Sequence, residues 1–183
     1  CNLRCDYCDT RHAYDDGEEF SLDELVAYAE NSGTRHVTIT GGEPLLQKGA
    51  LKLMTRLCDL GFDVTLETGG SESTAAVDPR VTRIIDFKTP DSGEQDQNHL
   101  ENIHLLRKED QVKFVISSQT DYDWALSLIS EFEILDRCQV LMSPVTSKLE
   151  PTTLAQWILN DRLEIRFQLQ LHKLLWPGED RGR

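Results

Sequence analysis

Hydrophobic and polar residues alternate along this chain in two different patterns. Short runs rich in valine and isoleucine predict strands at 36–40, 62–67, 83–88, 112–116, 140–142 and 165–171. Amphipathic stretches of helical period predict helices at 50–60, 99–107, 122–132 and 154–159. An earlier helix begins at a capping box formed by Ser21 and Glu24 and ends at Gly33. In the helix at 122–132, the spacing of Trp124, Leu128 and Phe132 predicts the stripe that faces the core.

The alternation of strands and helices predicts an α/β fold with right-handed βαβ units and a mostly parallel sheet. In such folds, ligands bind beyond the C-terminal ends of the strands. Five predicted strands end in polar or glycine-rich segments, which indicates an enzyme. These segments are Gly41-Gly42-Glu43-Pro44, Glu67-Thr68-Gly69-Gly70, Asp86-Phe87-Lys88-Thr89-Pro90, Ser117-Ser118-Gln119 and Ser143-Pro144.

The composition narrows the class of protein. The length of 183 residues predicts one domain over 1–183. Its 32 acidic and 19 basic residues give a net charge of -13, which disfavours binding to nucleic acid or to an anionic membrane. No apolar run approaches the roughly 18 residues of a membrane span, so we expect a cytoplasmic protein. Because the chain starts at Cys1 and not at Met, we expect that an N-terminal segment, including a first strand, is missing.

Three cysteines lie close together near the start of the chain. Cys1, Cys5 and Cys8 bring three soft thiolate ligands into one loop, which favours zinc, copper(I) or an iron–sulfur cluster. A structural zinc site needs a fourth ligand, for which His12 is a candidate. An iron–sulfur cluster on three thiolates leaves one iron open to an outside ligand. Two further cysteines stand alone in apolar surroundings and predict packing residues: Cys58 and Cys138.

Two motifs resemble those of a known superfamily. The spacing Cys1-x3-Cys5-x2-Cys8, with Tyr7 before the last cysteine, resembles the signature of radical S-adenosylmethionine (SAM) enzymes. The segment Thr40-Gly41-Gly42-Glu43-Pro44 resembles that superfamily's Gly-Gly-Glu motif. Further segments resemble the 7-carboxy-7-deazaguanine synthase family: Cys8-Asp9-Thr10, Glu67-Thr68-Gly69-Gly70, Asp86-Phe87-Lys88-Thr89-Pro90, Gln170-Leu171-His172-Lys173, and Trp176 followed by Arg181-Gly182.

The resemblance implies a partial (β/α) barrel with a 4Fe–4S cluster, SAM and Mg²⁺ as cofactors. The cluster ligands would be Cys1, Cys5 and Cys8, and Thr10 would bind Mg²⁺; these four form the expected catalytic set. The expected cofactor-binding residues are Tyr7, Cys8, Asp9, Gly42, Glu43, Glu67, Gly70, Ser117, Ser118, Gln119, Ser143 and Pro144. The expected substrate-binding residues are Thr68, Lys88, His172 and Pro177, with His172 at the last strand.

Several of these residues have simpler interpretations when they are considered without the family. Gly-Gly-Glu-Pro alone is typical of a turn, and Thr10 of a loop residue with a local backbone bond. Lys88 fits a surface lysine equally well, since its aliphatic stem can lie on apolar surface. A histidine between leucines, such as His172, is more often structural.

The resemblance implies conversion of 6-carboxy-5,6,7,8-tetrahydropterin to 7-carboxy-7-deazaguanine with loss of ammonia, for 7-deazapurine (queuosine) synthesis. It also implies a flavodoxin-like or ferredoxin-like electron donor and a homodimer. A glycyl-radical-enzyme activase is the alternative within the superfamily, although such activases usually carry Cys-His-Asn where this chain has Cys8-Asp9-Thr10. A zinc-binding structural module is the alternative from a different class.

Overall fold

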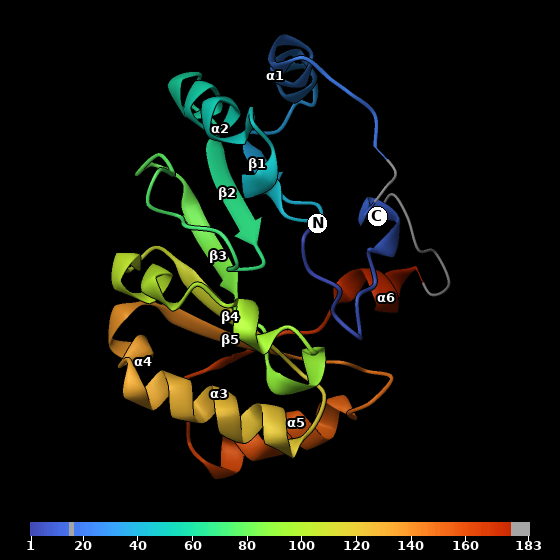
Figure 1. Cartoon of the computed structure of the whole chain (residues 1–183), viewed down its shortest axis with the longest axis vertical. Coiled ribbons are helices and arrows are strands. Elements are labelled where there is room, and N and C mark those ends of the chain that lie inside the picture. Colours follow the sequence, from blue (N-terminus) through green and yellow to red (C-terminus); the bar gives the residue numbers. More distant parts are fainter. Residues whose placement is uncertain (15–16, 177–183) are drawn as a thin grey trace.

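The computed structural model describes residues 1–14 and 17–176. Its centre is one sheet of six parallel strands, arranged in chain order. The described residues leave β1 and β6 as its two edges, so the sheet is an open, partial (β/α) barrel (Figure 1). The strands are β1 (His36–Ile39), β2 (Asp63–Thr68), β3 (Thr82–Asp86), β4 (Gln111–Ile116), β5 (Gln139–Pro144) and β6 (Arg166–Phe167).

Helices connect most of the strands. The α-helices are α1 (Leu22–Asn31), α2 (Ala50–Asp59), α3 (Gln119–Glu131), α4 (Ile134–Arg137), α5 (Pro151–Asn160) and α6 (Leu171–Leu175). Short 3-10 helices occupy Arg11–Tyr14, Pro44–Leu46, Pro90–Ser92, Gln95–Gln97 and Leu100–Leu105. In Figure 1, α1 to α5 lie along the outer side of the curved sheet, whereas the N-terminal segment and α6 lie across from it. No helix within residues 1–14 and 17–176 is long and apolar enough to cross a bilayer.

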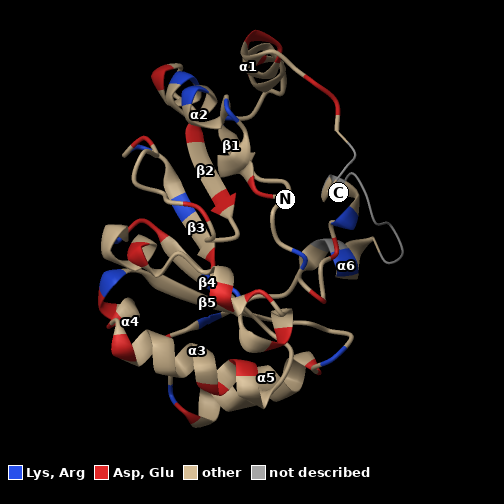
Figure 2. Cartoon of the chain, viewed as in Figure 1, with Lys and Arg blue, Asp and Glu red and all other residues tan. Residues whose placement is uncertain are grey.

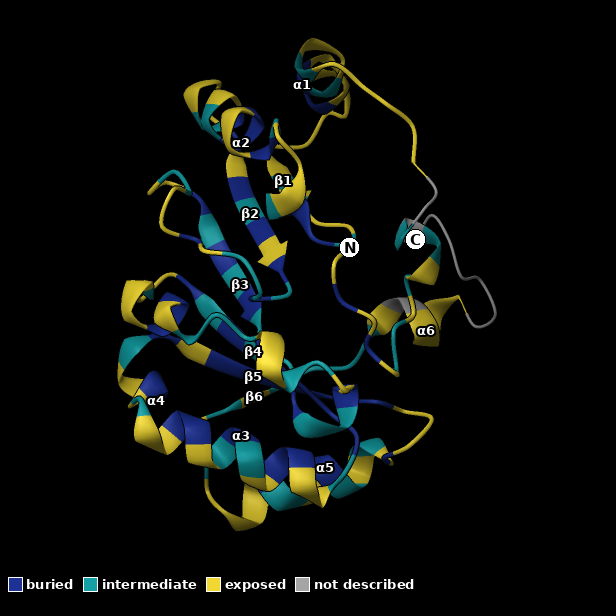
Figure 3. Cartoon of the chain, viewed as in Figure 1, coloured by how far each residue is buried: buried dark blue, intermediate teal, exposed yellow. Residues whose placement is uncertain are grey.

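The helices bury two apolar clusters against the sheet. The larger cluster lies between β3–β5 and α3–α5, with Phe87, Phe114 and Met142 fully buried. The smaller one packs α1 and α2 on β1 and β2 around Met54 and Leu66. Figure 3 shows this buried layer between the strands and the helices. Both lone cysteines pack there, as predicted: Cys138 belongs to the larger cluster and Cys58 borders the smaller one.

Local sequence signals explain several boundaries. The predicted capping box opens α1: the amide of Glu24 donates to the Ser21 hydroxyl at 3.2 Å, and the Glu24 carboxylate accepts from the Ser21 amide at 2.8 Å. Gly61, with φ +81°, follows α2 in the left-handed conformation that glycine permits. The predicted strand positions agree with β1 to β5 to within two residues at either end.

The C-terminal strand prediction was wrong beyond its first residues. Only Arg166–Phe167 pair with β5, and the chain then turns into α6, so His172 lies on a helix and not at a strand end. The segment after Phe167 leaves the sheet because it makes a polar contact with the N-terminal loop and does not continue to pair with β5. The Gln170 side chain donates to the Asp9 carboxylate at 2.9 Å, which draws this segment to the N-terminal loop.

Two helical predictions are confirmed with differences in detail. The segment predicted at 99–107 forms a shorter helix of 3-10 type over Leu100–Leu105, in which the buried Asn102 side chain bonds the backbone of Thr74 and Glu72. In α3 all three residues of the predicted stripe contact the core: Leu128 belongs to the larger apolar cluster, and Trp124 and Phe132 are partly buried and pack against it. The buried residues of this helix are Asp121, Tyr122, Ala125, Leu128 and Ile129.

A buried ion pair fixes the N-terminal ends of β3 and β4. Nη2 of Arg83 lies 2.5 Å from Oδ2 of Asp110, whose side chain is fully buried, and Arg107 bonds the same carboxylate. Burial alone would raise the pKa of Asp110, but the two guanidinium groups outweigh it and lower the pKa to about 2.

Asp110→Asn is therefore expected to lower the free energy of unfolding by about 3–5 kcal/mol at pH 7, because two guanidinium groups lose their buried partner. Since the pKa is depressed in the folded state, the stabilisation is present above pH ~4 and is lost as the pH falls towards 2. Urea unfolding at several pH values measures both effects. The exposed Asp136→Asn is the control, and equal stability of the two variants at pH 7 would contradict the assignment.

Candidate functional site

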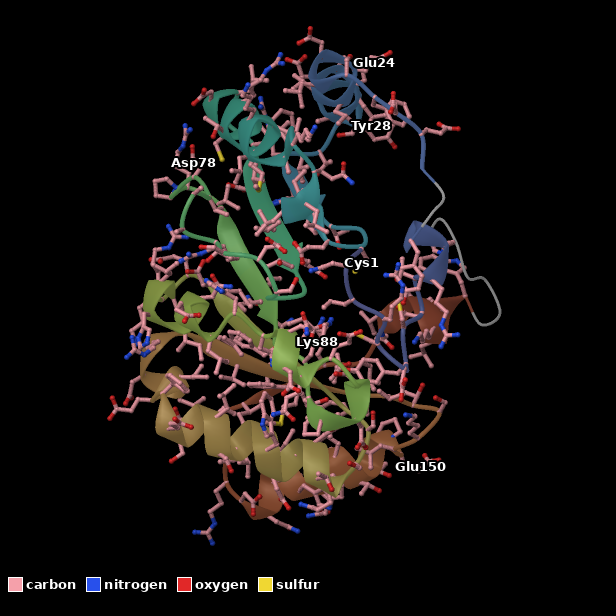
Figure 4. All side chains as sticks on the ribbon, viewed as in Figure 1. Cys1, Glu24, Tyr28, Asp78, Lys88 and Glu150 are labelled. Carbon is pink, nitrogen blue, oxygen red and sulfur yellow. The ribbon has the colours of Figure 1, made fainter. Side chains whose placement is uncertain are left out.

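A cavity of about 460 Å³ lies at the C-terminal ends of the strands. Residues from all six strands, or from the segments that directly follow them, form its wall together with the N-terminal segment and α6. In Figure 4, Cys1 on the N-terminal segment and Lys88 after β3 both lie on the side of the sheet away from α2 and α3. The predicted location of the site is therefore where the structure has its cavity.

The N-terminal loop brings its three thiols to this one cavity. Cys1, Cys5 and Cys8 all line it, and all three are free. The loop is held by backbone bonds: the amide of Cys8 donates to the Cys5 carbonyl at 3.1 Å, and the amide of Asp6 donates to the Ser92 carbonyl at 3.0 Å. Burial raises the pKa of the Cys5 thiol, and the positive charge of Lys88 offsets only part of this.

The Gly-Gly-Glu segment supports the cysteine loop from β1. A Cβ atom on Gly42 would lie 2.7 Å from the Cβ and 2.8 Å from the backbone nitrogen of Cys1, so only glycine fits there. Glu43, 3% exposed, accepts hydrogen bonds from the Thr68 hydroxyl at 2.8 Å and the Gly69 amide at 2.8 Å. It also accepts from the Leu45 amide at 3.0 Å. Its carboxylate thus joins the end of β1 to the end of β2.

The segment after β3 places an ion pair in the cavity wall. Nζ of Lys88 lies 3.1 Å from Oδ2 of Asp86, and the Lys88 side chain is 12% exposed. Burial alone would lower the pKa of Lys88, but Asp86 and Cys5 outweigh it, and the pKa is raised. This lysine is therefore not the exposed surface residue of the simpler interpretation.

A second polar group joins the N-terminal loop to α6. The Thr10 hydroxyl donates to Asp9 Oδ1 at 3.0 Å, and Lys173 Nζ lies 2.9 Å from Asp9 Oδ2. Burial alone would raise the pKa of Asp9, but the bonds and the charge of Lys173 outweigh it, and the pKa is lowered. Thr10, Asp9 and Lys173 all line the cavity.

The cavity wall includes only some of the predicted site residues. Those that line it are Cys1, Cys5, Tyr7, Cys8, Asp9, Thr10, Gly42, Glu67, Thr68, Lys88 and Ser143. Those described but not in the wall are Glu43, Gly70, Ser117, Ser118, Gln119 and Pro144. Pro177 lies outside the described residues, as does the side chain of His172.

The residues outside the wall have structural partners. Ser118 is the N-cap of α3, where its hydroxyl accepts from the Asp121 amide, and the Gln119 side chain donates to Asp123 at 2.8 Å. The Ser117 amide donates to the buried Asp121 carboxylate at 2.8 Å. Gly70, with φ +74°, faces Ile85. These contacts support the strand ends from outside the cavity wall.

Comparison with known proteins assigns the family. The 7-carboxy-7-deazaguanine synthase of Chlorobaculum tepidum is 43% identical over all of this chain and 84% of its own length, and that of Koribacter versatilis is 36% identical over all of this chain and 87% of its own. The chain belongs to the 7-carboxy-7-deazaguanine synthase family. It is therefore a radical SAM enzyme, and residues 1–91 match the family model described as the radical SAM superfamily.

Solved structures agree with the fold. Streptococcus suis SuiB bound to its precursor peptide SuiA superimposes with a TM-score of 0.63 at 14% identity, over 93% of this chain and 46% of that one. SuiB bound to S-adenosylmethionine gives a TM-score of 0.62 at 14% identity, over 93% of this chain and 45% of that one. At this identity the likeness shows a shared fold, which confirms the partial barrel.

The residues present in this family member fit a 4Fe–4S cluster and SAM, the cofactors of the radical SAM superfamily. Three free thiols line one cavity, and thiolates are the ligands that iron–sulfur clusters take. The cavity volume is in the range usual for small-molecule sites. Three buried polar atoms of wall residues, the Tyr7 hydroxyl oxygen, Asp86 Oδ1 and Gln168 Oε1, have no hydrogen-bond partner, which suits a polar ligand.

The structure adds wall residues that were not among the predicted site residues. Gln168 and Gln170 follow β6, Lys113 comes from β4, and Tyr14 from the N-terminal segment. Burial and a hydrogen bond with Cys8 raise the pKa of Tyr14 to about 12. Lys113 could have been identified from the sequence, because it is a charged residue between apolar neighbours in a predicted strand. The others lie in segments whose course depends on tertiary contacts.

Gly42→Ala is expected to prevent stable cluster assembly, because the added methyl group would displace Cys1. Iron and sulfide per chain after anaerobic reconstitution measure this directly, and we expect the variant to retain little of either. Gly17→Ala is the matched control, since nothing lies within 4 Å of the Cβ it would add. Cluster loading of Gly42→Ala equal to that of the control would show that the close approach to Cys1 is unimportant.

Proposed function

We propose that the chain converts 6-carboxy-5,6,7,8-tetrahydropterin to 7-carboxy-7-deazaguanine, a carbon–nitrogen lyase reaction that releases one ammonia and contracts the pterin ring. The names of the relatives support this product. The observation that carries the proposal is the convergence of the three motif cysteines on one cavity at the strand ends.

We assign cluster ligation to Cys1, Cys5 and Cys8. When bound, the cluster and SAM would supply one-electron chemistry for hydrogen-atom abstraction. The protein must orient the reactants and keep out water and other hydrogen donors. Leu3, Val115 and Val145 provide apolar wall for this purpose. The close packing of Cys1 on Gly42 then sets how the loop faces the strand ends.

We assign some wall residues to SAM and others to the pterin. We place SAM beside Tyr7, Cys8, Asp9, Gly42, Glu67 and Ser143, and the pterin beside Thr68 and Lys88. Glu43 acts as a positioning residue in this proposal, because its carboxylate is already bonded to Thr68 and Gly69. Glu67, an exposed acid in the cavity wall, is free to accept from a ribose hydroxyl or an ammonium group.

Thr10 is the proposed protein ligand of Mg²⁺. Its hydroxyl hydrogen is directed to Asp9, which leaves the oxygen lone pairs available as a hard donor in the cavity wall. Asp9 itself is engaged by Lys173 and Gln170. Mg²⁺ commonly keeps several waters and takes few protein ligands, so one hydroxyl with substrate and water oxygens is a reasonable set.

The remaining parts of the proposal concern the assembly. All 183 residues would act as one radical SAM domain in the cytoplasm, as a homodimer, with a flavodoxin-like or ferredoxin-like protein as the electron donor.

An anaerobic assay with the reconstituted protein, reductant, SAM, Mg²⁺ and the carboxytetrahydropterin is expected to yield 7-carboxy-7-deazaguanine and one ammonia per turnover. Cys5→Ala should abolish product, whereas Cys58→Ala, which removes a thiol outside the cavity, should retain it. Product is followed by its absorbance and by mass spectrometry. No product from a protein that holds its cluster and binds SAM would contradict the proposed substrate.

Thr10→Ala is expected to raise the Mg²⁺ concentration needed for half-maximal rate roughly tenfold or more, as is typical when a metal site loses a supporting group. Thr10→Ser keeps the hydroxyl and should respond as the unaltered chain does. The measurement is the initial rate over a Mg²⁺ titration. An unchanged Mg²⁺ response of Thr10→Ala would remove this residue from the metal site.

A further inference from the structure

The charged residues of the cavity wall do not all have partners. Within residues 1–14 and 17–176, the wall contains three acids and three lysines: Asp9, Glu67, Asp86, Lys88, Lys113 and Lys173. Asp9 pairs with Lys173 at 2.9 Å, and Asp86 with Lys88 at 3.1 Å. The described chain therefore leaves Lys113 as the one lysine of the wall whose ammonium group has no hydrogen bond or ion pair.

The strand geometry places Lys113 on the cavity side of β4. Its neighbours Val112 and Phe114 are fully buried in the larger apolar cluster, and alternate residues of a strand point to opposite faces. Lys113 and Val115 therefore share the other face, and both line the cavity. Lys113 is half-buried between these apolar neighbours, and no side-chain contact among the described residues accounts for a charged residue at this position.

Asp86 is the structural partner that such a lysine would be expected to have. Its Cα lies directly opposite that of Lys113 in the β3–β4 register. However, the Asp86 carboxylate is paired with Lys88 and not with Lys113. Lys88 therefore holds this carboxylate, and within the described residues the ammonium group of Lys113 has no carboxylate partner.

An ammonium group without a partner in a cavity wall is available to bind an anionic group of a ligand. We propose that Lys113 binds a ligand carboxylate in this cavity. This inference rests on the proposed function, which offers two sources of that group: the methionyl carboxylate of SAM and the 6-carboxylate of the pterin. Gln168 Oε1, buried in the wall without a partner, offers an acceptor to a donor group of either molecule.

Binding measurements on the anaerobically reconstituted chain, without reductant so that no turnover occurs, test the proposal. The ligands are SAM and decarboxylated SAM in one arm, and carboxytetrahydropterin and 6-methyltetrahydropterin in the other. Lys113→Met removes the charge at similar length, and Lys113→Gln provides a second neutral variant. Lys52→Met, on the exposed surface of α2, is the control. Dissociation constants come from equilibrium dialysis.

The expected result is a loss of affinity that needs the carboxylate. Both Lys113 variants should bind one carboxylate-bearing ligand roughly 10- to 100-fold more weakly, the range of a charged hydrogen bond, while its carboxylate-free analogue binds nearly as before. The arm that shows this identifies the source. Lys113→Arg, which keeps the charge, should recover part of the affinity.

Two results would overturn the proposal: unchanged affinity for both carboxylate-bearing ligands, or equal weakening of each ligand and its analogue, which would indicate a structural role. Failure of the proposed function would give a different binding result. A chain with native Lys113 that binds SAM but no pterin would contradict the proposed substrate, and the SAM arm would still decide the role of Lys113.

Discussion

The buried carboxylate of Glu43 is the contact on which the site depends. It accepts from the Thr68 hydroxyl and from the Gly69 and Leu45 amides, so one side chain ties the turn after β1 to the end of β2. That turn holds Gly42 against Cys1, and the cysteine loop lies over the strand ends as a result. A buried carboxylate is costly unless its oxygens are bonded, and three donors make this arrangement stable.

The net charge of -13 does not describe the cavity wall. Figure 2 shows acidic and basic residues together on helices along the outer side of the sheet. The cavity wall, in the part of the chain that the structure describes, balances three acids with three lysines. The pair of Asp86 and Lys88 is largely buried and therefore less screened by solvent than surface charges, so it acts on a ligand in the cavity more strongly than the overall charge does.

The two faces of the sheet have different roles. On β4, Val112 and Phe114 pack in the core, whereas Lys113 and Val115 face the cavity. The cavity is completed by contacts between distant parts of the sequence, since Asp9 near the start of the chain bonds Gln170 and Lys173. The open barrel thereby gains a wall on the side where the described sheet has no further strand.

The sequence by itself determined the parallel α/β fold, the first five strands, the α1 capping box and the family, because strand period, capping residues and motif spacing are local properties. Only the tertiary structure decided that the chain leaves the sheet after Phe167, and that Glu43 bonds to Thr68. It also decided which lysine of the wall has a partner. Those outcomes depend on which side chains meet across the strand ends, and a contact between residues far apart in the chain leaves no mark in local periodicity.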